Sequence, residues 1–305
     1  MPPLLEQVLE RSNLRLAWEK VAENRGIPGV DRVSIARWRR NWEERLENLR
    51  TSVLSGSYHP SPLRIRAIPK STPGQWRILR IPTVNDRVLQ RAVLQVLSPI
   101  FEPRFLDCSF GYRPGFGLRQ AVQRILDLRE KDYTWVLDAD IDAFFDSVNH
   151  ALLLRFLEDS IEDHRLLQLI SEWLAVRNAV NKPGTGIPMG SPLSPLLANI
   201  YLHPLDTALI QRGYHPVRYA DDFIVLCRNR DTAERAYIQV EAILADLFLK
   251  YEPDKTRISS FEEGFTFLGV RFLDKTFSFT YQEKTIESDD RQVSWLYSDY
   301  FPDYE

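Results

Sequence analysis

The sequence predicts an α+β fold in which an antiparallel sheet is backed by helices. Short apolar strands are interleaved with amphipathic helices along the 305-residue chain. The clearest hairpin has two apolar runs around the adjacent carboxylates Asp221 and Asp222. A second apolar run, residues 133–141, alternates so that Asp138 and Asp140 share one face. We therefore expect two acid-bearing strands.

Helical spacing of apolar residues predicts most of the other elements. It occurs in five stretches: 4–54, 88–100, 118–128, 149–158 and 232–249. Alternation over 65–81 predicts two strands that are joined by a turn ending at Gly74. Ser194 followed by Pro195 predicts an N-cap and the first residue of a further helix, which Gly213 would close.

Composition restricts the class of protein. Hydrophobic residues make up 44% of the chain and charged residues 27%, as in ordinary globular proteins. No apolar run approaches the roughly 20 residues of a membrane span, and the first residues carry no secretion signal. Cys108 and Cys227 lack the spacing of metal ligands, so we expect small core residues and a cytoplasmic location.

The adjacent carboxylates of Asp221 and Asp222 create an electrostatic problem. Like charges repel, which raises one pKa unless a cation lies between them. A divalent metal ion meets this need because it binds hard oxygen ligands. Aspartate is also a common turn residue, so the pair alone could be an ordinary turn. The second acid-bearing strand favours the metal site, since carboxylates from two strands can hold the two ions of a phosphoryl-transfer centre.

The distribution of charge is uneven although the net charge is only −3. Residues 61–130 contain twelve Lys or Arg against five Asp or Glu. A basic stretch of this kind can contact a nucleic-acid backbone, or it can be a solvated face. The region that carries the paired acids is net acidic, as expected where bound cations supply the missing charge.

A succession of short motifs extends from about Leu14 to Phe272. The segments are 68–70, 76–87, 101–105, 109–114, 140–150, 186–199, 219–222, 255–256 and 267–269. In this order they resemble the motifs of bacterial reverse transcriptases of the group II intron-like lineage. One such motif would be weak evidence, whereas so many in register are specific.

The resemblance implies both a fold and a reaction. The fold would be a right-hand polymerase with fingers and palm and with a thumb that is short or absent. The reaction would be RNA-directed DNA synthesis, in which a primer 3′-hydroxyl is extended with deoxynucleoside triphosphates by two-metal phosphoryl transfer. Two Mg²⁺ ions, or Mn²⁺, would be the cofactors. An RNA template and a DNA or RNA primer would be the partners.

The same resemblance assigns roles to individual residues. The implied catalytic residues are Asp140, Asp221 and Asp222. The implied metal ligands are these three and Ile141. The implied nucleotide-binding residues are Lys70, Arg77, Phe145, Met189 and Lys255. The implied primer and template contacts are Tyr219, Gly190, Leu268 and Gly269. Asp138 and Asp142 lie beside Asp140, but the register of the motif favours Asp140.

Several of these residues also have ordinary interpretations. Phe145 would stack under the sugar and exclude a 2′-hydroxyl, although a Phe-Phe pair can equally be core packing. Lys70 and Arg77 would clasp the triphosphate, although exposed basic residues are commonly plain surface. Lys255 would neutralise or protonate the departing pyrophosphate, or it is a solvated lysine after a turn.

Residue 189 departs from the commoner pattern of the family. Many relatives have Gln where this chain has Met189, so a hydrogen-bonding amide is replaced by a soft apolar side chain. A similar Pro-Met-Gly form occurs in reverse transcriptases of CRISPR loci. This resemblance implies acquisition of spacers from RNA, with the CRISPR adaptation integrase as a partner. Two alternatives stay open: a retron-like or other standalone antiphage enzyme, and a subunit that binds RNA or the integrase and polymerises weakly.

We expect four regions along the chain. They are an N-terminal helical extension (1–60), fingers (61–130), palm (131–272, with fingers elements near 150–185) and an acidic-aromatic tail (273–305). Residues 282–305 hold seven acids against two bases, together with several aromatic residues. Such a tail could dock on a basic partner or remain a flexible, solvating segment.

Overall fold

The computed structural model describes residues 2–69, 74, 76–176, 182–281 and 284–289. It contains two compact units, each built from two segments of the chain. The first unit comprises residues 1–104 and 145–200, and the second comprises residues 105–144 and 201–305. These units cut across the regions expected from the sequence, because residues 105–130 belong to the same unit as most of the predicted palm.

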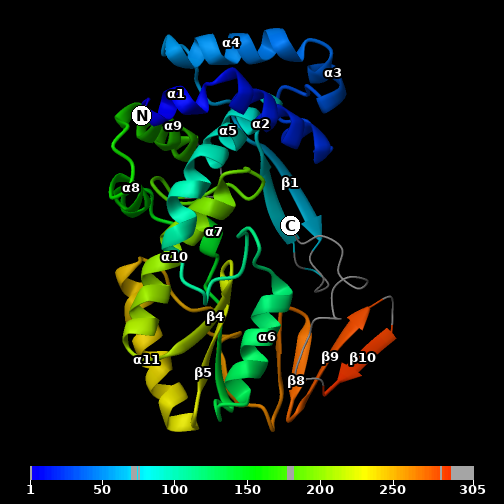
Figure 1. Ribbon diagram of the computed structural model, residues 1–305, viewed down its shortest axis with the longest axis vertical. Helices are drawn as coiled ribbons and strands as arrows, with labels where there is room; N and C mark the ends of the chain where they lie inside the picture. Colours follow the sequence, from blue (N-terminus) through cyan, green and yellow to red (C-terminus); the bar gives the residue numbers. More distant parts are fainter. Residues whose placement is uncertain (1, 70–73, 75, 177–181, 282–283, 290–305) are drawn as a thin grey trace. The chain divides into compact units, whose positions relative to one another are not determined.

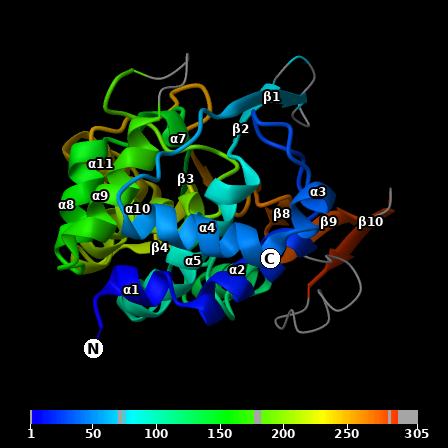
Figure 2. The same ribbon diagram turned by 90° about the horizontal axis from the view of Figure 1, so that it is seen from above.

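Helices dominate the first unit (Figures 1 and 2). They are α1 (Leu4–Val8), α2 (Arg11–Glu23), α3 (Ile35–Arg39), α4 (Trp42–Leu54), α5 (Val84–Phe101), a 3₁₀ turn (Glu102–Arg104), α8 (His150–Glu158) and α9 (His164–Ala175). Helices α7 (Phe144–Ser147) and α10 (Ser194–Gln211) span two of the three points at which the chain passes from one unit to the other. Helix α5 is largely buried and packs against α1 and α2, so it forms the core of this unit.

A two-stranded antiparallel hairpin projects from the helices of the first unit (Figure 1). It pairs β1 (Arg64–Pro69) with β2 (Trp76–Ile81), which confirms the two strands predicted from alternation. Arg77 lies opposite Ile68 in this register. Most side chains of β1 are exposed.

An antiparallel four-stranded sheet forms the centre of the second unit, with strand order β4-β5-β3-β6. The strands are β3 (Trp135–Ala139), β4 (His215–Tyr219), β5 (Asp222–Cys227) and β6 (Arg257–Ser260). Helix α6 (Leu118–Arg129) packs against β4, while α11 (Arg230–Asp246) packs against β3, β5 and β6 (Figure 1). The predicted antiparallel sheet backed by helices is thus confirmed.

A second four-stranded sheet has the order β10-β9-β8-β7. Its strands are β7 (Phe265–Phe267), β8 (Val270–Leu273), β9 (Thr276–Tyr281) and β10 (Lys284–Ser288). The expected tail was therefore wrong for residues 276–281 and 284–288, which form strands. Phe277 and Phe279 alternate into the apolar core shared with α6, and this apolar signal precedes the acidic stretch that suggested a tail. Residues 290–305 lie outside the described part of the chain.

The smaller expectations from the sequence had different outcomes. Ser194 is not the N-cap: it is the first helical residue of α10, and its hydroxyl donates a hydrogen bond to the Pro188 carbonyl at 2.8 Å. Gly213 follows the end of that helix with φ +80°, as expected.

Cys108 and Cys227 are both free and buried, which confirms their interpretation as core residues. Among the described residues, no helix combines the length and apolar character needed to cross a membrane.

Candidate active site

Two acid-bearing strands lie side by side in the central sheet. In the β3–β5 register, Asp138 is opposite Ile224 and Ala139 is opposite Phe223. One further step along this antiparallel register brings Asp140 to the level of Asp222. Because alternate residues of a strand point to the same face, Asp138, Asp140 and Asp222 all belong to the face that carries α6. The sequence had predicted this shared face for Asp138 and Asp140.

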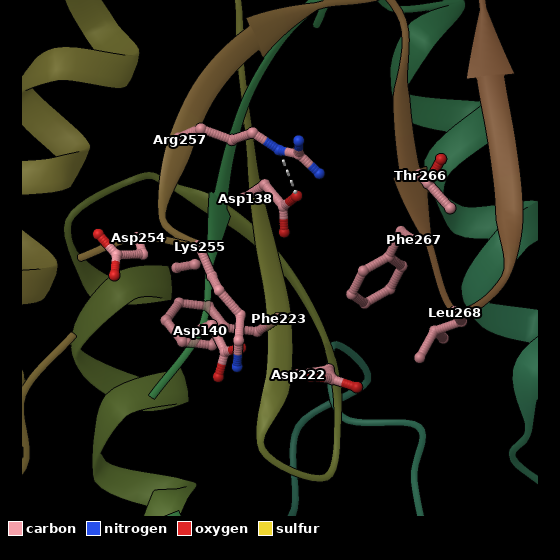
Figure 3. Close-up of a pocket in the computed structure, with 11 residues that line it drawn as sticks. Asp138, Asp140, Asp222, Phe223, Asp254, Lys255, Arg257, Thr266, Phe267 and Leu268 are labelled. Atoms are coloured by element: carbon pink, nitrogen blue, oxygen red, sulfur yellow. Dashed lines mark hydrogen bonds and ion pairs between the residues drawn. The ribbon is translucent and has the colours of Figure 1, made fainter. Parts of the chain in front are cut away.

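These acids line a cavity of about 320 Å³ in the second unit (Figure 3). Its lining residues are Asp138, Ala139, Asp140, Asp222, Phe223, Asp254, Lys255, Arg257, Thr266, Phe267 and Leu268. The cavity extends from the ends of β3 and β5 to the β7–β8 turn. That turn holds Leu268 at φ +51° and Gly269 at φ +76°. Leu268, predicted as a primer contact, thus shares the cavity with the predicted catalytic acids Asp140 and Asp222, and Gly269 is its neighbour.

Basic side chains from one segment neutralise two acids of the cavity. Lys255 Nζ lies 2.7 Å from Asp140 Oδ2, and Arg257 Nε lies 3.3 Å from Asp138 Oδ2 (Figure 3). The backbone amide of Glu252 also donates to the Asp140 carbonyl at 2.8 Å. The segment that follows α11 therefore lies along the end of β3 and supplies countercharge to its carboxylates.

Asp222 has the most perturbed carboxyl of the cavity. Its low-polarity surroundings, and repulsion from Asp221, Asp140 and Asp138, raise the pKa of Asp222 to about 7. The Asp222 side chain is exposed at the start of β5, where three neighbouring carboxylates repel its charge. Near neutral pH this cluster therefore either shares a proton or binds a cation.

The other predicted residues of this unit lie around the same hairpin. Asp221 is in the two-residue turn between Tyr219 and Asp222, which pair with each other. The Tyr219 ring lies 6.4 Å from the ring of Tyr112. Ile141 is buried, and its backbone bridges to Tyr251.

Two predicted nucleotide contacts, Phe145 and Met189, and one predicted primer or template contact, Gly190, lie in the first unit around Arg80. The buried Arg80 Nη2 lies 2.6 Å from Asp146 Oδ1, beside Phe145, and its backbone amide donates to the Met189 carbonyl at 2.7 Å. Gly190 has φ +121°, and a Cβ there would be 2.8 Å from the Arg80 carbonyl oxygen. Sequence reasoning missed Arg80. The available signal was its place in the alternation of β2, on the face opposite to that of Arg77.

The two residues of the Phe-Phe pair have different surroundings. Phe144 is buried at 2% exposure, whereas Phe145 is half-buried and its carbonyl accepts a hydrogen bond from the Ile187 amide. The core-packing alternative thus applies to Phe144, which leaves Phe145 accessible. Arg77 is exposed on β2, and Lys70 lies outside the described residues.

The carboxylates of the second unit are of the ligand type that binds a divalent metal ion, although the described side chains are not arranged around one ion. In the described ranges, no group of three or more His, Cys, Asp or Glu side chains is arranged to hold a metal. The donors are carboxylate oxygens, which are the ligands that hard cations prefer. The mutual repulsion at Asp222 and the ammonium group at Asp140 both indicate that this cluster requires positive charge.

The family model for reverse transcriptase (RNA-dependent DNA polymerase) matches residues 68–272. The chain belongs to the reverse transcriptase family. This membership confirms the resemblance inferred from the motifs, and members of the family use divalent metal ions. The match includes Asp138, Asp140, Asp221 and Asp222 and the β7–β8 turn.

Individual relatives differ in length. Protein YkfC of Escherichia coli is 32% identical over 299 residues, covering 81% of this chain and 76% of that protein. The group II intron-encoded protein LtrA of Lactococcus lactis is 36% identical over 176 residues, covering 55% of this chain but 29% of LtrA. A chain of a partial Cas6-RT-Cas1–Cas2 complex is 26% identical, with coverage of 80% and 43% and a TM-score of 0.49.

The Lys255–Asp140 pair predicts competition with metal ions. Lys255→Ala removes the ammonium group that occupies Asp140, so we expect Mn²⁺ affinity, measured by calorimetry, to rise about two- to fivefold, the range of an exposed ion pair. Lys250→Ala is the matched control, because Lys250 Nζ pairs with the adjacent acid Asp142 at 2.9 Å. An equal rise of Mn²⁺ affinity in both variants would mean that the loss of any nearby positive charge has this effect. An unchanged affinity in Lys255→Ala would contradict competition between Lys255 and the metal ion.

Proposed function

We propose that this chain is an RNA-directed DNA polymerase that extends a primer 3′-hydroxyl with deoxynucleotides. The observation that carries the proposal is the cavity in which Asp140 and Asp222, from neighbouring strands, lie beside the turn that bears Asp221. Membership of the reverse transcriptase family supports the same reaction. The crowding of carboxylates is costly without a cation, which supports a catalytic rather than a purely structural use.

Asp140, Asp221 and Asp222, with the backbone of Ile141, are the proposed ligands of two Mg²⁺ ions. When bound, the ions supply activation of the attacking oxygen and stabilisation of the leaving oxygen. The protein's own contribution is to hold the carboxylates on adjacent strands, where the sheet hydrogen bonds keep them together against their repulsion.

Other residues are proposed to bind and orient the reactants. Lys255, which lies 2.7 Å from Asp140, would supply positive charge near the departing pyrophosphate. Leu268, which lines the cavity, and its neighbour Gly269 would contact the primer. The exposed Arg77 would contact the triphosphate through its two-pronged guanidinium.

The first test of the function is primer extension on an RNA template. Asp140→Asn and Asp221→Asn keep the size of the side chain but remove a charge. We expect each to lower the extension rate by at least about 10³-fold, because electrostatic stabilisation of the reacting phosphate is lost. Extension by either variant at the wild-type rate would contradict the site. An inactive but folded wild-type protein would favour the alternative of an RNA- or integrase-binding subunit.

Phe145 is the proposed determinant of sugar selectivity. Its half-buried position, in contrast to the buried Phe144, supports contact with the sugar. Phe145→Ala should increase the use of ribonucleotides relative to deoxynucleotides by about 10-fold or more, because space for a 2′-hydroxyl is opened. Single-nucleotide incorporation with matched ATP and dATP measures this ratio. An unchanged ratio would remove the role from Phe145.

A narrower proposal concerns the biological setting. Met189, in the Pro-Met-Gly form, supports acquisition of spacers from RNA together with the CRISPR adaptation integrase. Purified chain and purified integrase should then elute as one complex in size-exclusion chromatography. Separate elution would contradict a role with the integrase and would favour a standalone or retron-like enzyme. The proposed polymerase activity would not be affected by that result.

A further inference from the structure

A buried ion pair precedes the acid-bearing turn of the central sheet. Arg218, on β4, is 0% exposed, and Asp206, on α10, is 1% exposed. Arg218 Nε donates to Asp206 Oδ1 at 2.8 Å, and Nη2 donates to Oδ2 at 2.6 Å. This two-pronged geometry is one that the planar guanidinium of arginine provides and the ammonium of lysine does not.

Stability alone is a poor reason for such a pair. Removing two charges from water costs about as much free energy as their attraction returns, and apolar residues of similar size are often as stable. The pair is favourable only when further hydrogen bonds satisfy the guanidinium. Those bonds go to the neighbourhood of the turn: Arg218 Nη1 donates to the Ala220 carbonyl at 2.9 Å, and Nη2 donates to Ser109 Oγ at 2.7 Å.

The turn that receives this hydrogen bond is strained. Ala220 is the first of the two residues between Tyr219 and Asp222, and its φ is +59°. A two-residue hairpin turn with positive φ at this position normally uses glycine, because a Cβ is disfavoured there. Such a conformation persists only where the surrounding structure holds it in place. The hydrogen bond from Arg218 to the Ala220 carbonyl is a direct restraint of this kind.

Residues 108–111, which form a loop, also contact the strand and turn around Ala220. The Arg218 amide donates to the Cys108 carbonyl and the Phe110 amide donates to the Arg218 carbonyl, both at 2.8 Å. A Cβ on Gly111 would lie 2.5 Å from the Ala220 nitrogen, so the two backbones are in direct contact. Ser109, between these residues, accepts the hydrogen bond from the guanidinium. The turn is thus held by the guanidinium of the ion pair and by contacts of residues 108–111.

We propose that Arg218 and Asp206 are positioning residues for the carboxylates of Asp221 and Asp222. The inference rests on the proposed function, since it assigns to the pair the orientation of the proposed metal ligands. Neither residue lines the cavity, so the pair acts through the Ala220 carbonyl and the path of the turn. Asp206 fixes the guanidinium, and the guanidinium fixes the turn.

Conservative variants of the pair test this role. Arg218→Lys keeps the charge but cannot reach Asp206 with two donors and Ala220 with a third, and Asp206→Asn removes the charge that orients the guanidinium. In single-nucleotide incorporation we expect kcat to fall about 10- to 100-fold, as a misplacement of about 1 Å can produce. The Mg²⁺ concentration for half-maximal rate should rise, while KM for the primer–template stays within about twofold.

Two further variants separate positioning from folding. Tyr58→Phe is the control, because it removes a hydrogen bond to the buried Asp86 of the first unit and should lower Tm without changing kcat or the Mg²⁺ dependence. If a single variant of the pair does not fold, Arg218→Met/Asp206→Leu removes both buried charges and should fold. Wild-type kcat and Mg²⁺ dependence in any folded variant of the pair would overturn the proposal.

Hydrogen exchange distinguishes failure of this inference from failure of the proposed function. In the full chain, amides of residues 217–223 should exchange at least about tenfold faster in the folded Arg218 variant than in the wild type, because the turn loses its restraint. If the wild type adds no nucleotide, the proposed function fails, and the exchange rates alone then test whether Arg218 restrains the turn. Faster exchange would then support the restraint, and unchanged exchange would overturn it.

Discussion

Repulsion among carboxylates is the constraint on which the second unit depends. Asp138, Asp140 and Asp222 come from neighbouring strands and face one cavity, and Asp221 occupies the adjacent turn. An isolated hairpin would relax by splaying these side chains apart. The four-stranded sheet, with α6 on one face and α11 on the other, prevents this relaxation. The energy of the packed core is thus used to keep like charges close together, which is the condition for binding cations.

Buried arginines have comparable tasks in the two units. In the first unit, Arg80 joins β2 to Asp146 of α7 and, through its backbone, to Met189. In the second, Arg218 joins β4 to Asp206 of α10 and to the turn at Ala220. In each case a buried arginine pairs with an aspartate of a helix and also bonds an irregular segment, Arg80 through its backbone amide and Arg218 through its guanidinium. Apolar packing restrains irregular backbone poorly, because it has no directional preference.

Local pattern and turn chemistry predicted a good part of this structure. Alternation over residues 133–141 indicated the shared face of Asp138 and Asp140, and the paired acids indicated the hairpin. Both features depend on residues that are close in sequence. The motifs added the family, which the comparison confirmed.

What the sequence did not reveal depends on contacts between distant elements. No periodicity indicates that Arg218 meets Asp206 and Ser109, or that Lys255 lies on Asp140. Strands β9 and β10 were missed because an excess of acids after residue 282 outweighed the alternation of Phe277 and Phe279. Both units are also assembled from separated segments, which composition cannot indicate.

This discontinuous assembly has a consequence for the order of folding. Because the first unit needs residues 145–200, residues 1–104 emerge from the ribosome long before their core can be completed. The second unit in turn interrupts the first and finishes last. Neither unit can therefore be produced by simply cutting the chain once, and the nascent protein exposes apolar surface for longer than a chain of consecutive domains would. Helices α7 and α10 each span a point at which the chain passes between the units, so neither helix is completed within one unit.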